Sequence, residues 1–205
     1  LRKVYAGRDM IGIRPMYYHH PSPESKQLIF TSEIKGAKHF DNSVREFPPG
    51  NILKFELMEL GGFELTSKQF DWVYDVVESK DITEEKILYN IRTAVVNSVR
   101  RRLDADRPIA FLLSGGVDSS LVAAIGRKIL GVPIKTFCCG MPGGTDLKYA
   151  KLVADHIKSH HSEVFFSEKE GVDALEDIIY ATETWDTTTV RASTGQYMVC
   201  KHIGT

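Results

Sequence analysis

Residues 114–120 read SGGVDSS, a short run that combines the residue types suited to binding a phosphate group. Its two adjacent glycines let backbone N–H groups come close to an anion, because no Cβ stands in the way. The hydroxyl groups of Ser114, Ser119 and Ser120 can donate hydrogen bonds to phosphate oxygens. The run has no lysine and lacks the G-x-G-x-x-G spacing, which excludes the two best-known glycine-rich phosphate loops.

Asp118 places a carboxylate in the same run, and a carboxylate facing a polyphosphate is repelled unless a cation lies between them. Mg²⁺ held by Asp118 and by phosphate oxygens is the simplest arrangement, because Mg²⁺ prefers oxygen ligands. The pattern S-G-G-x-D-S resembles the pyrophosphate loop of the N-type ATP pyrophosphatases, which bind ATP, adenylate an acyl or carbonyl oxygen and release pyrophosphate. The alternative is a plain turn between a strand and a helix, with Asp118 as the helix N-cap.

The segments on either side of this run predict the elements that position it. Residues 109–113 are apolar and predict a buried strand, and residues 118–130 predict a helix. A glycine-rich turn between a strand and a helix points backbone N–H groups and the helix N-terminus at an anion. The order of the elements therefore agrees with phosphate binding.

Strands and helices go on alternating through the second half of the chain. Further strands are predicted at 134–139 and 163–166, and further helices at 146–159 and 171–184. This order predicts an α/β fold with a doubly wound parallel sheet, whose ligands bind at the carboxyl ends of the strands. The loop at 114–119 follows the first of these strands, so the motif and the topology agree.

The first part of the chain, up to about Trp72, is β-rich. Residues 16–18 and 27–32 predict a hairpin, and residues 51–57 alternate like a half-buried strand. Residues 33–38 indicate a short helical turn.

A polar segment of mixed character at 71–81 is the best candidate for a linker. A helix is predicted to begin near Thr83, with an apolar stripe at i, i+4 spacing that is typical of a helix packed on a core. The stripe consists of Ile87, Ile91, Ala94, Val95 and Val99. The expected division is a first domain at 1–72, a linker at 73–82 and a second domain at 83–205.

The composition of the 205 residues, 42% hydrophobic and 26% charged, is ordinary for a soluble globular protein. A formal net charge of -1 gives no general attraction to nucleic acid or to an anionic membrane, so neither is expected as a partner. No apolar run approaches the roughly 20 residues of a membrane-spanning helix.

The chain contains three cysteines, Cys138, Cys139 and Cys200, and they form no C-x-x-C pair. Two of them lie in a predicted buried strand, where free thiols indicate a reducing compartment and hence the cytoplasm.

Six blocks along the chain resemble one family, the glutamine-dependent asparagine synthetases, and they follow the family's order. The last block is the most specific, and a generic ATP pyrophosphatase would share only the loop. The blocks are 7–17 (GRDMIGIRPMY), 32–36 (SEIKG), 47–50 (FPPG), 114–120 (SGGVDSS), 140–147 (GMPGGTDL) and 183–194 (ETWDTTTVRAST).

The resemblance implies a fold and a reaction. Residues 1–72 would be the C-terminal part of an N-terminal-nucleophile (Ntn) amidotransferase domain. Residues 83–205 would be the N-terminal half of an ATP-pyrophosphatase synthetase domain. ATP and Mg²⁺ are implied, together with the small-molecule substrates aspartate and glutamine. Aspartate would be activated as β-aspartyl-AMP, and ammonia from glutamine would displace AMP to give asparagine.

The same resemblance assigns roles to individual residues. Asp9 matches the carboxylate that binds the α-ammonium group of glutamine, with a purely structural turn at Arg8 and Asp9 as the alternative. Thr188 and Arg191 match residues around the acyl-adenylate, where a guanidinium can neutralise a carboxylate or developing charge. Asp118 matches the ligand of Mg²⁺ and pyrophosphate. The positions that match the ATP site are Leu112, Ser114, Gly115, Gly116, Asp118, Ser119 and Cys139.

Two residues depart from the family's pattern. Cys139 replaces an aliphatic residue whose backbone contacts the nucleotide, and Gly195 replaces a proline, which is expected to loosen a turn. Both ends of the chain fall inside expected domains, so the chain is expected to be an internal fragment that is inactive alone.

Alternative functions stay open at this point. One is a related synthetase that acts on another carboxylate, similar to a β-lactam synthetase. Another is a non-catalytic paralogue that binds a nucleotide. Assembly as a homodimer is also left open.

Overall fold

The computed structural model describes residues 3–19, 27–37, 43–58, 63–69 and 82–204. The chain divides into two compact units, 1–78 and 79–205, and each is described by itself. The predicted linker at 73–82 lies outside the described residues apart from Ile82, so its boundaries stay a prediction.

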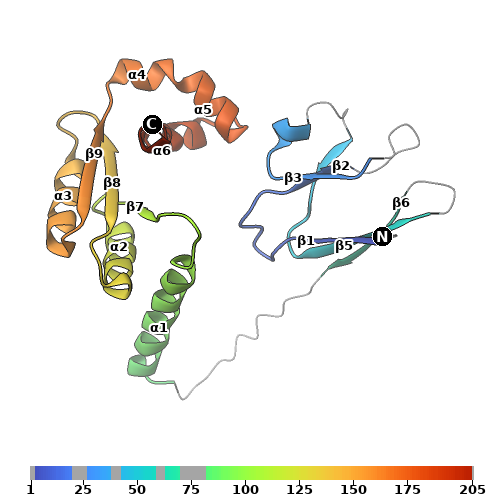
Figure 1. Ribbon diagram of the computed structural model, residues 1–205, viewed down its shortest axis with the longest axis horizontal. Helices are drawn as coiled ribbons and strands as arrows, with labels where there is room; N and C mark the ends of the chain where they lie inside the picture. Colours follow the sequence, from blue (N-terminus) through green and yellow to red (C-terminus); the bar gives the residue numbers. More distant parts are fainter. Residues whose placement is uncertain (1–2, 20–26, 38–42, 59–62, 70–81, 205) are drawn as a thin grey trace. The chain divides into compact units, whose positions relative to one another are not determined.

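Among its described residues the first unit contains two antiparallel sheets, with the strand orders β1-β5-β6 and β3-β2-β4 (Figure 1). The predicted hairpin of 16–18 with 27–32 is confirmed as the pair β2 and β3. The predicted helical turn is confirmed as a 3-10 helix, η1 (Ile34–Ala37). The strands are β1 (Lys3–Gly7), β2 (Tyr17–His19), β3 (Ile29–Thr31), β4 (Val44–Glu46), β5 (Asn51–Leu57) and β6 (Phe63–Gln69).

Alternation along β5 builds the core of this unit. Leu53 and Phe55 point to the same face, because strand side chains alternate, and both are buried. They pack with Tyr18 and Phe47, whose rings meet edge to face with centroids 5.8 Å apart. The backbone N–H of Phe47 also donates to the carbonyl oxygen of Met16 at 2.8 Å, so this core holds the loop that follows β1.

The second unit contains a parallel sheet with the strand order β7-β8-β9, which confirms the predicted α/β class with a parallel sheet (Figure 1). No helix among the described residues has the length and apolar character needed to cross a membrane. The strands are β7 (Ala110–Leu112), β8 (Lys135–Gly140) and β9 (His160–Phe165). The helices are α1 (Glu84–Arg102), α2 (Val117–Leu130), α3 (Thr145–Ile157), α4 (Glu168–Asp173), α5 (Leu175–Thr182) and α6 (Thr187–Gly204).

Helices cover both faces of this sheet, as two neighbouring cysteines of β8 show. Consecutive residues of a strand point to opposite faces. The side chain of Cys138 is buried in a cluster that includes Leu147 and Ala150 of α3. The thiol of Cys139 instead contacts Gly195 of α6. Helices α3 and α6 therefore lie on opposite faces of the sheet.

Helix α2 lies close to β7 because Gly126 has no side chain. A Cβ at this position would come within 2.4 Å of Cζ of Phe111, whose side chain is buried. The close approach holds the strand and the helix on either side of the loop at 114–116, so the loop is anchored at both ends.

The predicted helix at 171–184 is wrong in its extent, because the segment forms two helices, α4 and α5. Ser167 and Glu170 form a capping box that starts α4 before the predicted position. In this box the N–H of Ser167 donates to the Glu170 carboxylate at 2.7 Å. Ala174 ends α4 and precedes α5, so the helical path breaks there.

The apolar stripe of α1 is buried only near its end. Val99 is 7% exposed, whereas Ile87 and Ile91 are 41% and 55% exposed. Among the described residues, full burial of the stripe is therefore limited to its C-terminal end, at Val99.

A polar cluster joins β8, β9 and the residues that follow α3. Oγ1 of Thr136 lies 2.8 Å from Oγ of Ser159 and 2.9 Å from Nδ1 of His161. Thr136 is fully buried, and Nε2 of His161 is buried without a hydrogen-bond partner in the described part of the chain. This environment suits the neutral imidazole, because a buried charge would lack a counter-charge in contact.

We expect the free energy of unfolding to fall as the pH drops below about 6.5, because of His161. Burial lowers the pKa of His161, with Glu163 and Asp155 opposing the shift and Lys151 adding to it. Between the lowered pKa and the unfolded value, the unfolded chain binds the proton more readily, so acidification favours unfolding.

Denaturant unfolding at about pH 7.5 and about pH 5.5 measures this dependence on pH. His161→Asn should flatten it, whereas His156→Asn, at an exposed histidine of α3, should leave it unchanged. The same pH dependence in all three proteins would contradict the assignment.

Candidate functional site

The loop at 114–116 leaves the carboxyl end of β7 and leads directly into α2 (Figure 1). Oγ of Ser119 lies 3.0 Å from Oγ of Ser114 and accepts from the N–H of Ser114 at 3.3 Å. It also lies 3.2 Å from the carbonyl oxygen of Gly116. These contacts hold two hydroxyls side by side at the N-terminus of α2, the arrangement predicted for an anion.

The shape of the loop requires glycine at position 115. Gly115 has a φ of +81°, in the left-handed region, and an added Cβ would lie 2.5 Å from Cβ of Tyr149 and 2.6 Å from N of Ala150. Gly116 differs, because its φ is −67° and an added Cβ would meet only Oγ of Ser114, at 3.5 Å. The first glycine therefore lets the loop pack against α3, and the second leaves space beside the helix N-terminus.

Asp118 lies in the first turn of α2 and does not cap the helix. The N-cap is Gly116, so the alternative of Asp118 as N-cap is wrong. The Asp118 carboxylate is exposed and makes no hydrogen bond or ion pair within the described residues. The described part of the chain holds no cluster of three or more metal-binding side chains. A single unpaired carboxylate beside a glycine-rich loop would suit an Mg²⁺ ion that takes its other ligands from a bound phosphate group.

A cavity of about 310 Å³ opens beside the loop, at the carboxyl ends of β7 and β8. Ligands of parallel α/β sheets bind at this edge. Gly115, Gly116 and Asp118 shape or flank the loop rather than line the cavity. The predicted residues that line it are Leu112, Ser114, Ser119 and Cys139.

Sequence reasoning misses the remaining residues of this lining. Asp146 carries a signal, because it lies in the block 140–147 that supports the family resemblance. The residues of α6 carry another, because positions 192, 195, 196 and 199 have the spacing of one helical face. The missed residues are Leu113, Phe137, Cys138, Asp146, Ala192, Gly195, Gln196 and Val199.

Helix α6 begins at a cap that the sequence block around it supplies. Oδ2 of Asp186 accepts hydrogen bonds from the N–H and the hydroxyl of Thr189, both at 2.8 Å. The backbone bond and then the hydroxyl bond lower the pKa of the Asp186 carboxyl. The carboxylate therefore stays charged and fixes the start of the helix.

The two predicted catalytic residues lie on α6 and are exposed. Thr188 precedes Ala192 by one turn, and Arg191 precedes Gly195 by one turn, so each shares a side of the helix with a residue of the cavity lining. Neither Thr188 nor Arg191 lines the cavity itself in the described structure. Gly195 lies inside α6, so the expectation of a loosened turn at this position is wrong.

Both thiols at the cavity stay protonated near neutral pH. Burial, with Cys139 and Asp146 adding to the effect, raises the pKa of Cys138 to about 11. Burial and then Asp146 also raise the pKa of Cys139. The thiolate is the nucleophilic form of cysteine, so neither residue is suited to act as a nucleophile. Cys139 is instead a hydrogen-bond donor, to the carbonyl oxygen of Gly195 at 3.2 Å.

Asp9 lies in the loop after β1, in the first unit. Its Oδ1 accepts from the N–H of Gly12 at 2.9 Å, and its Oδ2 accepts from the N–H of Ile13 at 3.1 Å. The Arg8 guanidinium donates to the carbonyl oxygen of Phe47 at 2.6 Å. These contacts support a structural role for the loop. The side chain of Asp9 is also exposed, so its role toward glutamine stays a prediction.

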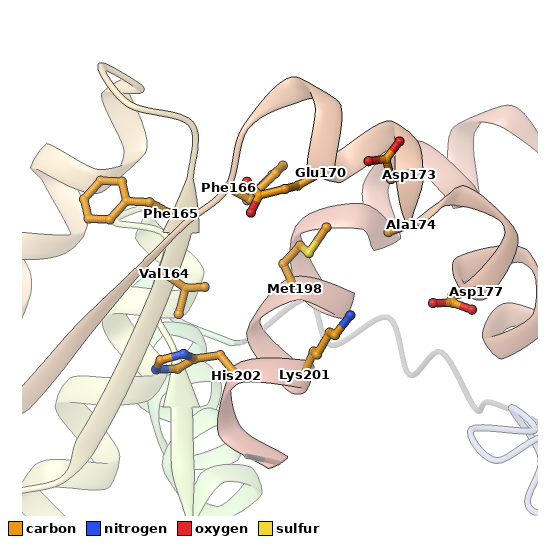
Figure 2. A pocket seen from close by; sticks show the side chains of 10 residues that line it. All are labelled: Val164, Phe165, Phe166, Glu170, Asp173, Ala174, Asp177, Met198, Lys201 and His202. Carbon is orange, nitrogen blue, oxygen red and sulfur yellow. The ribbon is translucent and has the colours of Figure 1, made fainter.

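A further cavity of about 380 Å³ is shown in Figure 2, with side chains from β9, α4, α5 and α6 around it. Its carboxylates already have partners. Glu170 belongs to the capping box of α4, Asp173 pairs with Lys169, and Asp177 accepts from the Tyr197 hydroxyl at 3.0 Å. No residue predicted from the sequence lines it, so the cavity beside the loop at 114–116 is the better candidate.

A family model described as "Asparagine synthase" matches residues 90–205, more than half of the chain. The chain belongs to this family. It is 37% identical, over 98% of its length, to the asparagine synthetase (glutamine-hydrolyzing) of Pongo abelii. It is 36% identical, over 96% of its length, to asparagine synthetase B (glutamine-hydrolyzing) of Escherichia coli strain K12. The family resemblance inferred from the sequence blocks is thereby confirmed.

The chain spans only part of these relatives, 40% of the first and 36% of the second. A solved structure of NMN synthetase from Francisella tularensis aligns with 59% of this chain and 50% of its own at 16% identity. Its TM-score of 0.36 is too low to support an argument about the fold.

Proposed function

We propose that the protein converts aspartate into asparagine at the expense of ATP, with glutamine as the nitrogen donor. The observation that carries the proposal is the SGGVDSS loop at the carboxyl end of β7, beside a cavity lined by Ser114 and Ser119, in a chain of this family. Aspartate is activated as β-aspartyl-AMP with release of pyrophosphate. Ammonia then displaces AMP.

In this proposal the loop binds the pyrophosphate part of ATP. Ser114 and Ser119 donate hydroxyl hydrogen bonds to phosphate oxygens, and the N-terminus of α2 adds its positive dipole end. Asp118 holds Mg²⁺, which neutralises phosphate charge when it is bound. The nucleoside part lies in the cavity, where Leu112 and Cys139 offer backbone groups at the ends of β7 and β8.

Helix α6 supplies the residues beside the acyl-adenylate. The Arg191 guanidinium neutralises the substrate carboxylate or the charge that develops at phosphorus. Arg191 is exposed and makes no ion pair within the described residues, which leaves its charge available to a substrate. Thr188 lies one turn before the cavity lining and provides a hydroxyl on the same side of the helix.

The glutamine half of the reaction belongs to the first unit, as the C-terminal part of an Ntn amidotransferase domain. Asp9 binds the α-ammonium group of glutamine through its exposed carboxylate. The reaction takes place in the cytoplasm, which the free cysteines support. A homodimer is part of the same proposal, and sedimentation of the purified protein tests it.

The protein expressed from its complete coding sequence should exchange labelled pyrophosphate into ATP when aspartate and Mg²⁺ are present. Reversible formation of β-aspartyl-AMP requires this exchange, and glutamate in place of aspartate is the control. Exchange with a different carboxylate alone would favour a synthetase similar to a β-lactam synthetase. ATP binding without any exchange would favour a non-catalytic paralogue, and either result would overturn the proposal.

A further inference from the structure

Cys139 and Gly195 are 56 residues apart in the sequence and meet at the cavity beside the phosphate loop. The Cys139 thiol, near the end of β8, donates to the carbonyl oxygen of Gly195 in α6 at 3.2 Å. A Cβ at position 195 would lie 2.9 Å from Sγ of Cys139, a distance that real Cβ atoms essentially never show. The glycine therefore makes room for the thiol.

A glycine in the interior of a helix needs a reason, because it weakens the helix relative to alanine. The close approach of Sγ supplies that reason at position 195. Gly126 of α2 is a second helix glycine of this kind, where an added Cβ would meet Phe111.

The contact joins one residue of β8 with one residue of α6. A change of size at one position is therefore felt at the other.

The contact bears on a helix that carries part of the proposed active site. Gly195 and Val199 lie one turn apart on the side of α6 that lines the cavity, and Val199 is 2% exposed. Arg191 lies one turn before Gly195 on the same side. A displacement of α6 at position 195 would move Arg191 and the cavity wall together.

The role of the thiol is to donate and to fill space, rather than to react. Burial and the Asp146 carboxylate raise the pKa of Cys139, so the protonated form, which can donate to the Gly195 carbonyl, is the one present near neutral pH.

We propose that Cys139 and Gly195 are a size-matched pair of positioning residues, which sets the distance between α6 and the carboxyl end of β8 and so the width of the nucleotide cavity. The proposal rests on the proposed function only in assigning a nucleotide to this cavity.

The test is a double-mutant cycle in the protein expressed from its complete coding sequence. Gly195→Ala should raise the KM for ATP in aspartate-dependent pyrophosphate release about tenfold, because the new Cβ pushes α6 away from Sγ. Cys139→Ala alone should have a smaller effect. The double variant should return the KM to within about threefold of the wild type, because the removal of Sγ clears the space. Cys200→Ala, at the exposed cysteine of the same helix and outside the cavity lining, is the control and should leave both KM and kcat unchanged.

Two results would overturn the proposal. One is a double variant whose change in log KM for ATP equals the sum of the changes in the two single variants. The other is a Gly195→Ala protein that loses thermal stability while its KM for ATP stays normal, since that shows a purely structural contact.

A wild-type protein without ATP-dependent activity would be a failure of the proposed function instead. In that case the same four variants are compared by thermal unfolding. Restoration of the unfolding temperature in the double variant supports the size-matched contact, and additive losses overturn it.

Discussion

Asp118→Asn should abolish aspartate-dependent release of pyrophosphate, with a loss of at least about a hundredfold in rate. Asparagine has nearly the size of aspartate but carries no charge, so it is a much weaker ligand for the Mg²⁺ ion that is expected to neutralise the phosphates. Asp118 is exposed, and in the described structure it makes no hydrogen bond or ion pair whose loss would disturb the fold. Steady-state assays of pyrophosphate release at saturating Mg²⁺ measure the loss.

Two controls separate this effect from unfolding. The substitution removes one negative charge from the first turn of α2, which costs about 0.3–1 kcal/mol of stability, so thermal unfolding should shift little. Glutamine hydrolysis should remain, because the proposed glutamine site lies in the other unit. Asp104→Asn, at an exposed carboxylate between α1 and β7, should leave pyrophosphate release unchanged. Normal synthesis of asparagine by Asp118→Asn would refute the role of this carboxylate.

The glycine-rich loop between β7 and α2 could be predicted from the sequence because its information is local. An apolar strand, two glycines, hydroxyls and a helix lie within about 20 consecutive residues. The residue types of each segment predict its local structure without reference to the rest of the chain. The structure places Ser114 and Ser119 side by side as expected. The local sequence does not decide which residue caps α2, because glycine and aspartate are both acceptable at an N-cap. In the structure the N-cap is Gly116.

The α6 wall of the cavity could not be predicted in the same way. The contact between Cys139 and Gly195 joins residues far apart in the sequence, and a glycine in a helix gives no sign of what approaches it. The same limit explains α1, where the pattern at Ile87 and Ile91 is that of a packed helix but only the end near Val99 is buried. Periodicity shows that a face is apolar, and the tertiary arrangement decides which part of it is covered.

Gly115→Ala should weaken ATP binding at least about tenfold, because the loop cannot keep its shape with a side chain at this position. The φ of Gly115 is +81°, and its added Cβ would overlap Cβ of Tyr149 at 2.5 Å and N of Ala150 at 2.6 Å. The backbone of α3 cannot move aside as a flexible side chain could, so the loop itself must shift away from the helix. The shift would carry the Ser114 hydroxyl away from Ser119 and from the phosphate oxygens. Titration with a non-hydrolysable ATP analogue measures the loss.

Gly116→Ala is the matched control for the stability of the loop, because it adds the same methyl group one residue later. Its φ of −67° suits any residue, and the nearest atom to the added Cβ is Oγ of Ser114 at 3.5 Å. Gly115→Ala should lower the free energy of unfolding by about 1–3 kcal/mol, through strain and overlap. Gly116→Ala should cost less than about 1 kcal/mol, the difference between glycine and alanine at an N-cap. Equal losses of stability in the two variants would show that the loop does not depend on its packing against α3. The packing of Gly115 against α3 would then not explain how the loop is held in the shape proposed to bind phosphate.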